Sequence, residues 1–225
     1  MTTTVSTTVS SRRQQTRDRL IDAATELFAE KSIEGASVEE ISERAGFTRG
    51  AFYSNFDSKE ALCLEIVRRR GEELLETTRR ALAVIPDAPV SVEWLEEIIA
   101  KVVTVLDVGF TLDDNWVLVR EELRLYAYRH PTFRPALIEI ERDANDLSMQ
   151  ALAAALDRHG ASLRIPIDQL MLTLDAFCER TQLDAILAGD PVNGNSWRDG
   201  LERLVRAVVM LPPEDDTGAV GRSDQ

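Results

Sequence analysis

The stretch from Gly35 to Leu62 restricts the possible fold more than any other part of this chain. Ser37 is followed three residues later by Glu40, the spacing at which two side chains bond each other's backbone N–H groups at a helix start. Gly46 is placed to end that helix in a left-handed conformation, which glycine adopts without steric cost. The segment therefore predicts two short helices joined by a tight turn.

Amphipathic helices are predicted on both sides of this turn. Before it, apolar residues recur over 12–31 with the spacing of one helical face, at Leu20, Ala24, Leu27 and Phe28. After it, a short helix is expected over 48–56, and a longer one that begins at Asp57 or Ser58 and ends near Ala83. The N-terminal part is therefore predicted to be a unit of three helices that continues into a long fourth helix.

The remainder of the chain has only helical patterns. They lie near 91–108, 113–129, 131–158, 167–188 and 196–210. No segment alternates apolar and polar residues as a half-buried strand would, and no internal repeat occurs. We expect an all-α fold, with an N-terminal helix-turn-helix domain over 12–62 and a C-terminal helical bundle over 63–211. Residues 1–11 and 212–225 are polar and are expected to be disordered.

Composition excludes a membrane span and a disulfide scaffold. The chain is 44% hydrophobic, but no run approaches the roughly 18 apolar residues that a membrane helix needs. The N-terminal segment lacks the apolar stretch of a secretory signal. Cys63 and Cys178 lie far apart without CxxC spacing, as expected of a protein in the reducing cytoplasm.

Motifs for catalysis, metals and cofactors are missing from the sequence. His130 and His159 each stand before a helix-ending residue and neither belongs to a metal-ligand spacing such as HExxH. The sequence also lacks GxSxG, the phosphate-binding loop and GxGxxG. We therefore predict no catalytic residue, no metal site and no cofactor.

The distribution of charge leaves room for a nucleic-acid partner despite the formal net charge of −13. Arg12, Arg13, Arg17 and Arg19 are opposed in their segment only by Asp18. Exposed charges separated by more than about 8 Å are largely screened at physiological salt, so a distant acidic body does not cancel them. These arginines could form a basic DNA-facing arm, or they could simply be the solvated start of a helix.

The helix over 48–56 has two different faces. Phe52 and Phe56 lie one turn apart and can pack inward, while Gly50, Ala51, Tyr53 and Ser54 fall on the other half of the wheel. Glycine in a helix costs about 1 kcal/mol relative to alanine, which a close approach to DNA base edges would explain.

Polar residues around this helix suit DNA contacts. Arg49 can reach a guanine edge with two hydrogen bonds. Contacts to phosphate oxygens are expected from Ser37, Thr48, Tyr53, Asn55 and Lys59. Taken singly, each of these residues also has an ordinary structural explanation, as a helix cap, a half-buried aromatic ring or a surface lysine.

The set of residues around the turn resembles the helix-turn-helix signature of the TetR family of bacterial transcriptional regulators. The resemblance spans residues 14–66 and is carried by Gly35, Ser37-Val38, Ile41, Ala45-Gly46, Thr48, Gly50, Phe52-Tyr53, Phe56, Lys59 and Leu62. It implies an Ω-shaped helical homodimer, usually a repressor, that binds double-stranded operator DNA and is released by a small ligand. The operator-contacting positions of the family match Ser37, Thr48, Arg49, Gly50, Tyr53, Asn55 and Lys59. Asn55 departs from the family, which often has histidine or tyrosine there.

The last two long helices and the cavity beside them are harder to interpret. The helices over 167–188 and 197–210 are apolar on more than one side, so each is buried on more than one side. The resemblance implies that they form the dimer interface, although both could be plain core helices. A largely apolar effector is expected in the bundle, near Trp116, Arg120, Arg124, Tyr126, Asn145, Met149, Phe177 and Cys178.

The sequence thus predicts a ligand-responsive DNA-binding regulator, with residues 12–62 binding DNA and residues 63–211 binding the ligand and the second subunit. The alternative is a helical scaffold or adaptor that keeps the fold without regulated DNA binding. The retained Gly50, Tyr53 and Lys59 favour the regulator.

Overall fold

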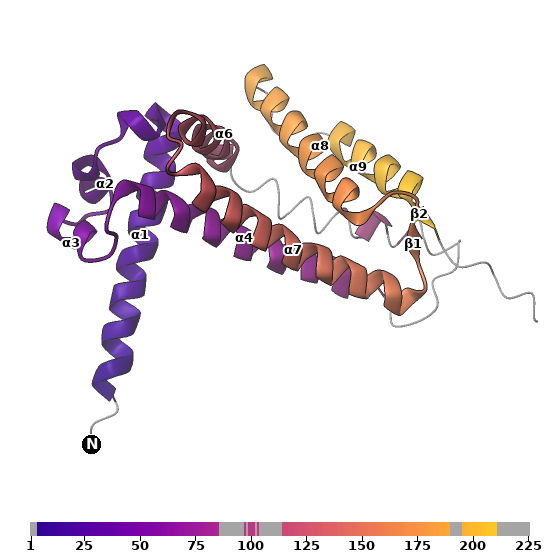
Figure 1. Cartoon of the computed structure of the whole chain (residues 1–225), viewed down its shortest axis with the longest axis horizontal. Coiled ribbons are helices and arrows are strands. Elements are labelled where there is room, and N and C mark those ends of the chain that lie inside the picture. The colour runs from indigo at the N-terminus through magenta and orange to yellow at the C-terminus, as the bar shows by residue number, and fades with distance from the viewer. Residues whose placement is uncertain are drawn as a thin grey trace, which may run out of the picture.

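The computed structural model describes residues 4–85, 97, 99–101, 103, 114–189 and 195–210, and nearly all of these are helical (Figure 1). The helices are α1 (Thr4–Gly35), α2 (Val38–Arg44), α3 (Arg49–Tyr53), α4 (Lys59–Ala83), α6 (Asp114–Arg129), α7 (Arg134–His159), α8 (Ile167–Ala188) and α9 (Asn195–Val208). The all-α prediction is confirmed. The helix expected near 91–108 lies mostly outside the described residues, as does the tail over 212–225.

The turn signals of the N-terminal unit act as predicted. The Ser37 hydroxyl accepts a hydrogen bond from the Glu40 N–H, and the Glu40 carboxylate accepts one from the Ser37 N–H. Gly46 has a φ of 74°, in the left-handed region. Ser58, and not Asp57, is the cap of α4, because its hydroxyl accepts from the Ala61 N–H at 3.1 Å. Local hydrogen bonds thus set where α2 and α4 begin.

α1 breaks where the helix predicted over 12–31 ends. The helical geometry fails at Lys31 and Ser32, and Ser32 has φ 74° and ψ 163°. This region of backbone space costs a residue other than glycine about 1–3 kcal/mol. The conformation is held because the Ser32 hydroxyl accepts from the Gly35 N–H, and the Lys59 ammonium donates to the Ile33 carbonyl at 2.7 Å.

Two helix boundaries differ from the prediction. α1 begins at Thr4, whereas the sequence pattern starts it near Arg12; once a helix has formed, each added residue costs little. α3 ends at Tyr53 and not at Phe56. The Ser54 hydroxyl and the Asn55 carboxamide both donate to the Ala51 carbonyl, and such local bonds compete with helix continuation.

A two-stranded ladder joins the two ends of the C-terminal helix pair. β1 (Ser162–Leu163) precedes α8 and pairs antiparallel with β2 (Val209–Met210), which follows α9. The Arg164 N–H extends the ladder with a bond to the Val208 carbonyl at 2.8 Å. Strands of two residues are too short to show alternation, so the sequence pattern does not predict them.

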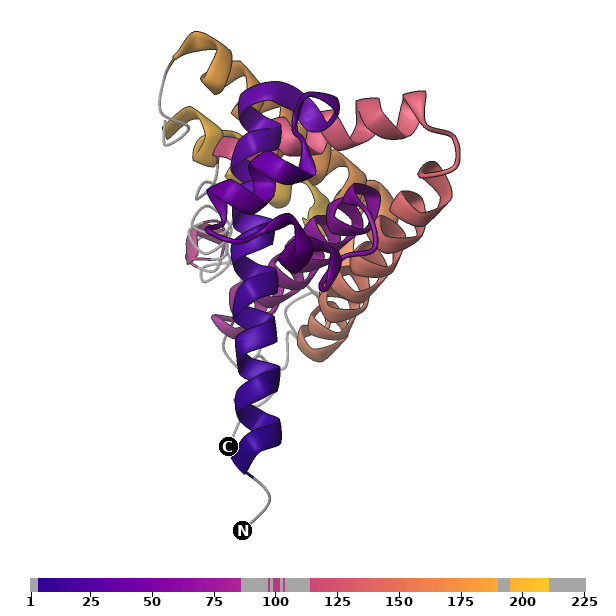
Figure 2. The same cartoon turned by 90° about the vertical axis from the view of Figure 1, so that its left-hand side faces the viewer.

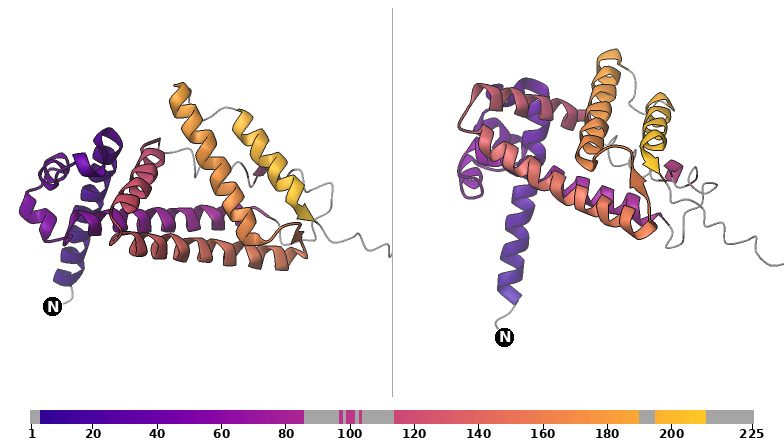
Figure 3. Two further views of the ribbon diagram at one scale, coloured as in Figure 1. Left: turned by 45° about the horizontal axis from the view of Figure 1, so that its top comes forward. Right: turned by 45° about the vertical axis from the view of Figure 1, so that its right-hand side comes forward.

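The helices form two regions (Figure 3). The head consists of α1, α2, α3 and the start of α4, and its core extends to residues of α6 and α7. Beyond the head, α4 and α7 run side by side, and α8 packs beside α9 (Figures 1 and 3). The N-terminal half of α1 projects away from the rest (Figure 2). Within the described residues, no helix is both long and apolar enough to span a bilayer.

Candidate functional site

One face of α3 is open to solvent. Phe52 and Phe56 are 0% and 4% exposed, and they fasten α3 to the core of the head. On the outer side, Thr48, Arg49, Gly50, Tyr53 and Ser54 are exposed, whereas Ala51 is half-buried. The helix therefore presents a polar surface with a glycine in it, as the sequence predicts for a surface that lies against DNA.

Gly50 has no packing reason to be glycine. A Cβ atom added there would meet only the Thr48 hydroxyl, at 3.7 Å, and the φ of Gly50 is not positive. Gly46 is different, because its positive φ and the nearby Arg19 guanidinium both oppose a side chain. The glycine at position 50 thus leaves space for something outside this molecule.

Arg49 is held in place on this face. Its guanidinium pairs with the Glu39 carboxylate of α2 at 2.6 Å and lies 5.5 Å from the centre of the Tyr53 ring. Both Arg49 and Glu39 are exposed, so the ion pair can open toward an outside partner. Sequence reasoning missed Glu39, because the pairing depends on the angle between α2 and α3.

Ser37 and Thr48 serve as helix caps. Their hydroxyls accept from the Glu40 and Ala51 N–H groups, respectively, at 3.2 and 3.3 Å. Each cap thus fixes the start of a short helix beside the exposed face of α3. The structural and the DNA-binding interpretations of Ser37 and Thr48 are therefore compatible.

Lys59 and Asn55 point into the protein. The Lys59 ammonium donates to the Ile33 and Ala36 carbonyls at 2.7 and 2.9 Å, at the junction of α1 and α2. The Asn55 carboxamide donates to the Ala51 carbonyl, and its oxygen is buried without a partner among the described residues. Lys59 is thus not the ordinary surface lysine of the alternative interpretation.

Two arginines of α1 support the end of α3. Arg17 donates to the Asn55 carbonyl at 2.8 Å, pairs with Glu65 at 3.0 Å and lies over the Phe56 ring. Arg13 donates to the Ser54 carbonyl at 3.4 Å. Part of the arginine-rich segment therefore positions α3, a role that its charge alone did not indicate.

A cavity of about 510 Å³ lies among α4, α7, α8 and α9. Most of its lining is aliphatic and includes Leu74 of α4, Leu152 of α7, Leu170 of α8 and Leu201 of α9. A volume of this size and an apolar lining suit a small organic molecule.

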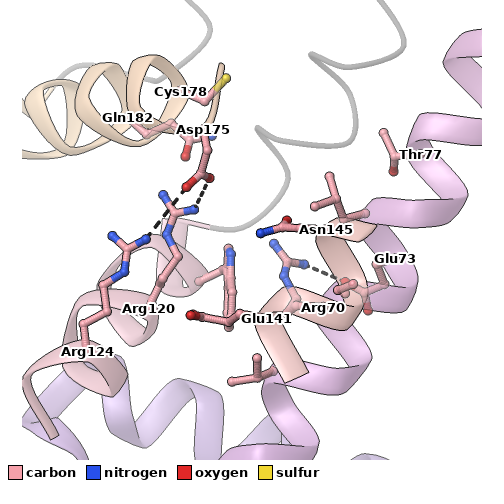
Figure 4. A pocket seen from close by; sticks show the side chains of 15 residues that line it. Arg70, Glu73, Thr77, Arg120, Arg124, Glu141, Asn145, Asp175, Cys178 and Gln182 are labelled. Carbon is pink, nitrogen blue, oxygen red and sulfur yellow. Dashed lines mark hydrogen bonds and ion pairs between the residues drawn. The ribbon is translucent and has the colours of Figure 1, made fainter. Parts of the chain in front are cut away.

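A second cavity, of about 170 Å³, lies beside it and is lined by charged side chains (Figure 4). Arg120 of α6 pairs with Asp175 and Glu179 of α8 at 2.8 and 3.1 Å. Arg124 also pairs with Asp175 and Glu179. The two cavities share Leu74, Glu141, Asn145, Asp175 and Cys178, so they adjoin.

Six of the eight effector-site candidates line these cavities: Trp116, Arg120, Arg124, Asn145, Met149 and Cys178. The other two lie elsewhere. Tyr126 is 6% exposed in the core of the head, where its hydroxyl donates to Glu60 at 2.7 Å. Phe177 packs against Gly200 of α9. Helical periodicity cannot separate these positions, because it gives the face of a helix but not the neighbour on that face.

Both cysteines are buried. Burial raises the pKa of the Cys63 and Cys178 thiols to about 12. A reactive cysteine needs a lowered thiol pKa and access to solvent. The two thiols are therefore small core groups and not redox sensors.

α6 contacts both regions of the molecule. Trp116, Arg120 and Arg124 of this helix line the charged cavity. Glu122 accepts from the Ile33 N–H at 3.4 Å, and His130, just after the helix, lies 3.2 Å from Glu34. The same helix thus touches the cavity and the junction between α1 and α2.

Comparison with known proteins points to one family. A family model described as bacterial regulatory proteins of the tetR family matches residues 20–66. The chain is 30% identical over 182 residues to the HTH-type transcriptional repressor DhaR of Mycobacterium sp., covering 73% of this chain and 89% of that protein. It is 28% identical over 204 residues to the HTH-type transcriptional repressor AcnR of Corynebacterium diphtheriae, covering 90% and 92%.

Solved structures share the fold. The transcriptional regulator FadR of Bacillus subtilis, in complex with stearoyl-CoA, has a TM-score of 0.63 at 18% identity, covering 83% of this chain and 96% of that one. The reduced form of E. coli NemR has a TM-score of 0.63 at 18% identity, covering 88% and 99%. The helical arrangement is thus common to chains with little sequence identity.

Proposed function

This chain belongs to the TetR family of bacterial regulatory proteins, and on that premise we propose that it is a repressor released from a pseudo-palindromic operator by a small, largely apolar molecule. Members of this family are DNA-binding transcriptional regulators and not enzymes. The observation that carries the proposal is the exposed face of α3, where Gly50 leaves room for a partner. The two similar repressors, DhaR and AcnR, support repression as the mode of action.

The proposed DNA contacts divide into base readout and phosphate contacts. Arg49 reads a guanine edge, and Gly50 with Ala51 lets the helix axis approach the bases. Phosphate oxygens are bound by Ser37, Thr48, Tyr53 and Ser54, whereas Asn55 and Lys59 point inward and support the DNA-binding face from behind. Lys59 acts in part through its carbonyl partners, because those bonds fix the entrance to α2.

A homodimer through α8 and α9 is the second part of the proposal. Leu172 and Leu187 of α8 are 70% and 76% exposed, and large apolar side chains on one helix are typical of a subunit interface. Two α3 helices must then reach successive major grooves, roughly 34–36 Å apart along the DNA. With roughly 6–10 phosphates neutralised, affinity should fall about 10³–10⁵-fold between 50 and 200 mM salt.

The effector site is the apolar cavity, and the adjoining charged cavity completes it. The fold is able to hold a small molecule, because FadR of Bacillus subtilis binds stearoyl-CoA with a similar arrangement of helices. A ligand shifts the equilibrium only if it binds the released form more tightly than the operator-bound form. We place residues 12–62 in the DNA-binding domain, residues 63–211 in the effector and dimer domain, and the protein in the cytoplasm with its operator.

Selection of binding sites from random duplex DNA tests this proposal. We expect a pseudo-palindromic site with half-sites one helical turn apart. Arg49→Ala should then relax the preference at one or two base positions by about 1–3 kcal/mol per position. Arg80→Ala, on α4 outside the head, is the control and should leave the selected site unchanged. Failure to enrich any sequence, at low salt and with folded protein, would contradict the proposal.

A further inference from the structure

Carboxylates outnumber guanidinium groups around the apolar cavity. Its charged lining residues are Glu141, Arg142, Asp146, Asp168 and Asp175. Arg142 is the single base among them and lies 3.7 Å from the neighbouring Asp143 carboxylate. The wall of the cavity is therefore apolar with an excess of negative charge.

The arginines of the adjoining cavity do not offset this excess, because each already has partners. Arg120 and Arg124 share the carboxylates of Asp175 and Glu179. Arg70 pairs with Glu73 at 2.7 Å, and its guanidinium lies over the Trp116 ring. An anionic ligand would have to displace these carboxylates and leave them partly buried without cations, which is costly.

Glu141 is the group that lacks a partner. Its carboxylate lies between the arginines of α6 and Arg70 of α4, and no dashed line reaches it in Figure 4. It lines both cavities, and within the described part of the chain no side chain ion-pairs or hydrogen-bonds with it. Burial raises the pKa of Glu141, while Arg124 and Arg120 lower it only through space. A carboxylate in this position would be stabilised by a positively charged ligand that enters the cavity.

The sequence between α4 and α6 adds almost no positive charge. Residues 84–113 contain one basic side chain, Lys101, against six acidic ones: Asp87, Glu93, Glu96, Glu97, Asp107 and Asp113. Lys101 is exposed and pairs with Glu97 at 2.6 Å. This segment therefore cannot reverse the sign of the charge around the cavity.

We propose that the effector is a lipophilic cation, with an apolar body that fills the 510 Å³ cavity and a positive centre beside Glu141. This inference rests on the proposed function, in which that cavity is the effector site. Opposite charges a few ångströms apart in a partly buried site attract strongly, and like charges repel to the same extent. An acyl-CoA, as bound by FadR, would bring its phosphates toward these carboxylates and is disfavoured here.

Two probes of the same shape and opposite charge test the sign of the site. Tetraphenylphosphonium and tetraphenylborate, each titrated into the full-length protein by calorimetry in potassium-free buffer, differ in little except charge. We expect the phosphonium to bind at least about tenfold more tightly, because a tenfold ratio needs only a modest electrostatic difference. Equal affinities, tighter binding of the borate, or no binding of the phosphonium would overturn the proposal.

A matched pair of variants on α7 assigns the effect to one carboxylate. Glu141→Gln keeps the shape of the side chain and should weaken phosphonium binding about tenfold while improving borate binding. Glu139→Gln, an exposed position that lines neither cavity, should leave both affinities unchanged. If Glu141→Gln binds the phosphonium as tightly as the unchanged protein does, Glu141 is not the counter-ion.

Operator binding separates this inference from the proposed function. If phosphonium binding depends on Glu141 but does not release the operator, the cavity binds cations but is not the effector site. If neutral or anionic compounds release the operator and the phosphonium does not, the effector is not a cation, although the protein is still a ligand-released repressor. Release by the phosphonium, lost in Glu141→Gln, supports both.

Discussion

The head and the bundle bury apolar side chains to different degrees. In the head, Phe28, Phe52 and Ile41 are 0% exposed and belong to one continuous cluster. In the bundle, the second cluster of the described residues has four buried members, Ile99, Val103, Cys178 and Leu201, and a 510 Å³ cavity lies beside it. A filled core fixes the position of α3, whereas an unfilled one leaves contacts for a ligand to make. The difference in packing thus matches the proposed division between a DNA-binding head and a bundle that binds the effector.

The largest expected effect comes from emptying the filled core. Phe52→Ala removes a fully buried ring and should lower the free energy of unfolding by about 3–5 kcal/mol. Met149→Ala, in the wall of the existing cavity, should cost about 1 kcal/mol or less, because its side chain is already partly unpacked. Urea unfolding followed by circular dichroism measures both. Equal losses would show that head and bundle are packed alike.

Two lysines extend the comparison to polar groups. Lys59→Met leaves the Ile33 and Ala36 carbonyls without their donor and should cost about 1–3 kcal/mol. Lys101→Met in the bundle breaks an exposed pair with Glu97 and should cost about 0–1 kcal/mol. Operator affinity should fall only for Lys59→Met. A Lys59→Met protein as stable as the unchanged one would mean that these bonds to carbonyls contribute nothing.

The same substitution at two glycines should have opposite effects. Gly50→Ala places its Cβ in open space and should stabilise the protein by about 0.5–1 kcal/mol while weakening operator binding. Gly71→Ala in α4 brings its Cβ to 2.7 Å from the Ala144 Cβ of α7 and should destabilise. Thermal unfolding and a mobility-shift titration measure the two properties. If Gly50→Ala binds the operator as tightly as the unchanged protein does, α3 does not approach the DNA closely at this residue.

The smallest effects concern acid stability, and their direction differs between the regions. In the head, the hydrogen bond from Lys31, together with the Ser37 N–H and hydroxyl, lowers the pKa of Glu40 from 4.5 to about 2. A lowered carboxyl pKa contributes stability above pH 4.5, and this is lost as the pH falls toward 2. Glu40→Gln should flatten the dependence of unfolding free energy on pH in that interval, as measured by urea titrations at several pH values.

Glu141 in the bundle should behave in the opposite way. Burial raises its pKa, against the through-space effect of Arg124 and Arg120 of α6, and Asp175 and Glu179 of α8 also face it. A raised carboxyl pKa favours the folded state most at low pH, and this contribution is lost as the pH rises above 4.5. Glu141→Gln should therefore gain relative stability with rising pH. If Glu141→Gln instead loses stability relative to the unchanged protein as the pH rises, the Glu141 carboxylate is in a favourable ion pair.

The sequence predicts those parts of the fold and of the site that depend on near neighbours. The box of Ser37 and Glu40, the turn at Gly46 and the inward faces of Phe52 and Phe56 all follow from local spacing. The all-helical architecture follows from periodicity in the same way. These features need only the helix geometry of a few residues.

Contacts between distant segments were not predictable from spacing. The pairing of Glu39 with Arg49 and the bonds from Lys59 to the end of α1 depend on how helices are placed in space. The left-handed backbone of Ser32 is stabilised by the same junction and has no local signal. The unpaired Glu141 is visible only once its neighbours are known. Helical periodicity gives a face for each residue, but tertiary packing decides what lies opposite.

The burial of the two native cysteines has a practical consequence for spectroscopy. Thiols with a pKa of about 12 remain protonated at neutral pH and react slowly with maleimides. A cysteine introduced at an exposed position such as Ser54 or Glu139 would then carry a fluorophore or a spin label selectively, without replacing Cys63 or Cys178. Separations between labels on the two subunits of the proposed dimer could thus be followed in the otherwise unaltered protein.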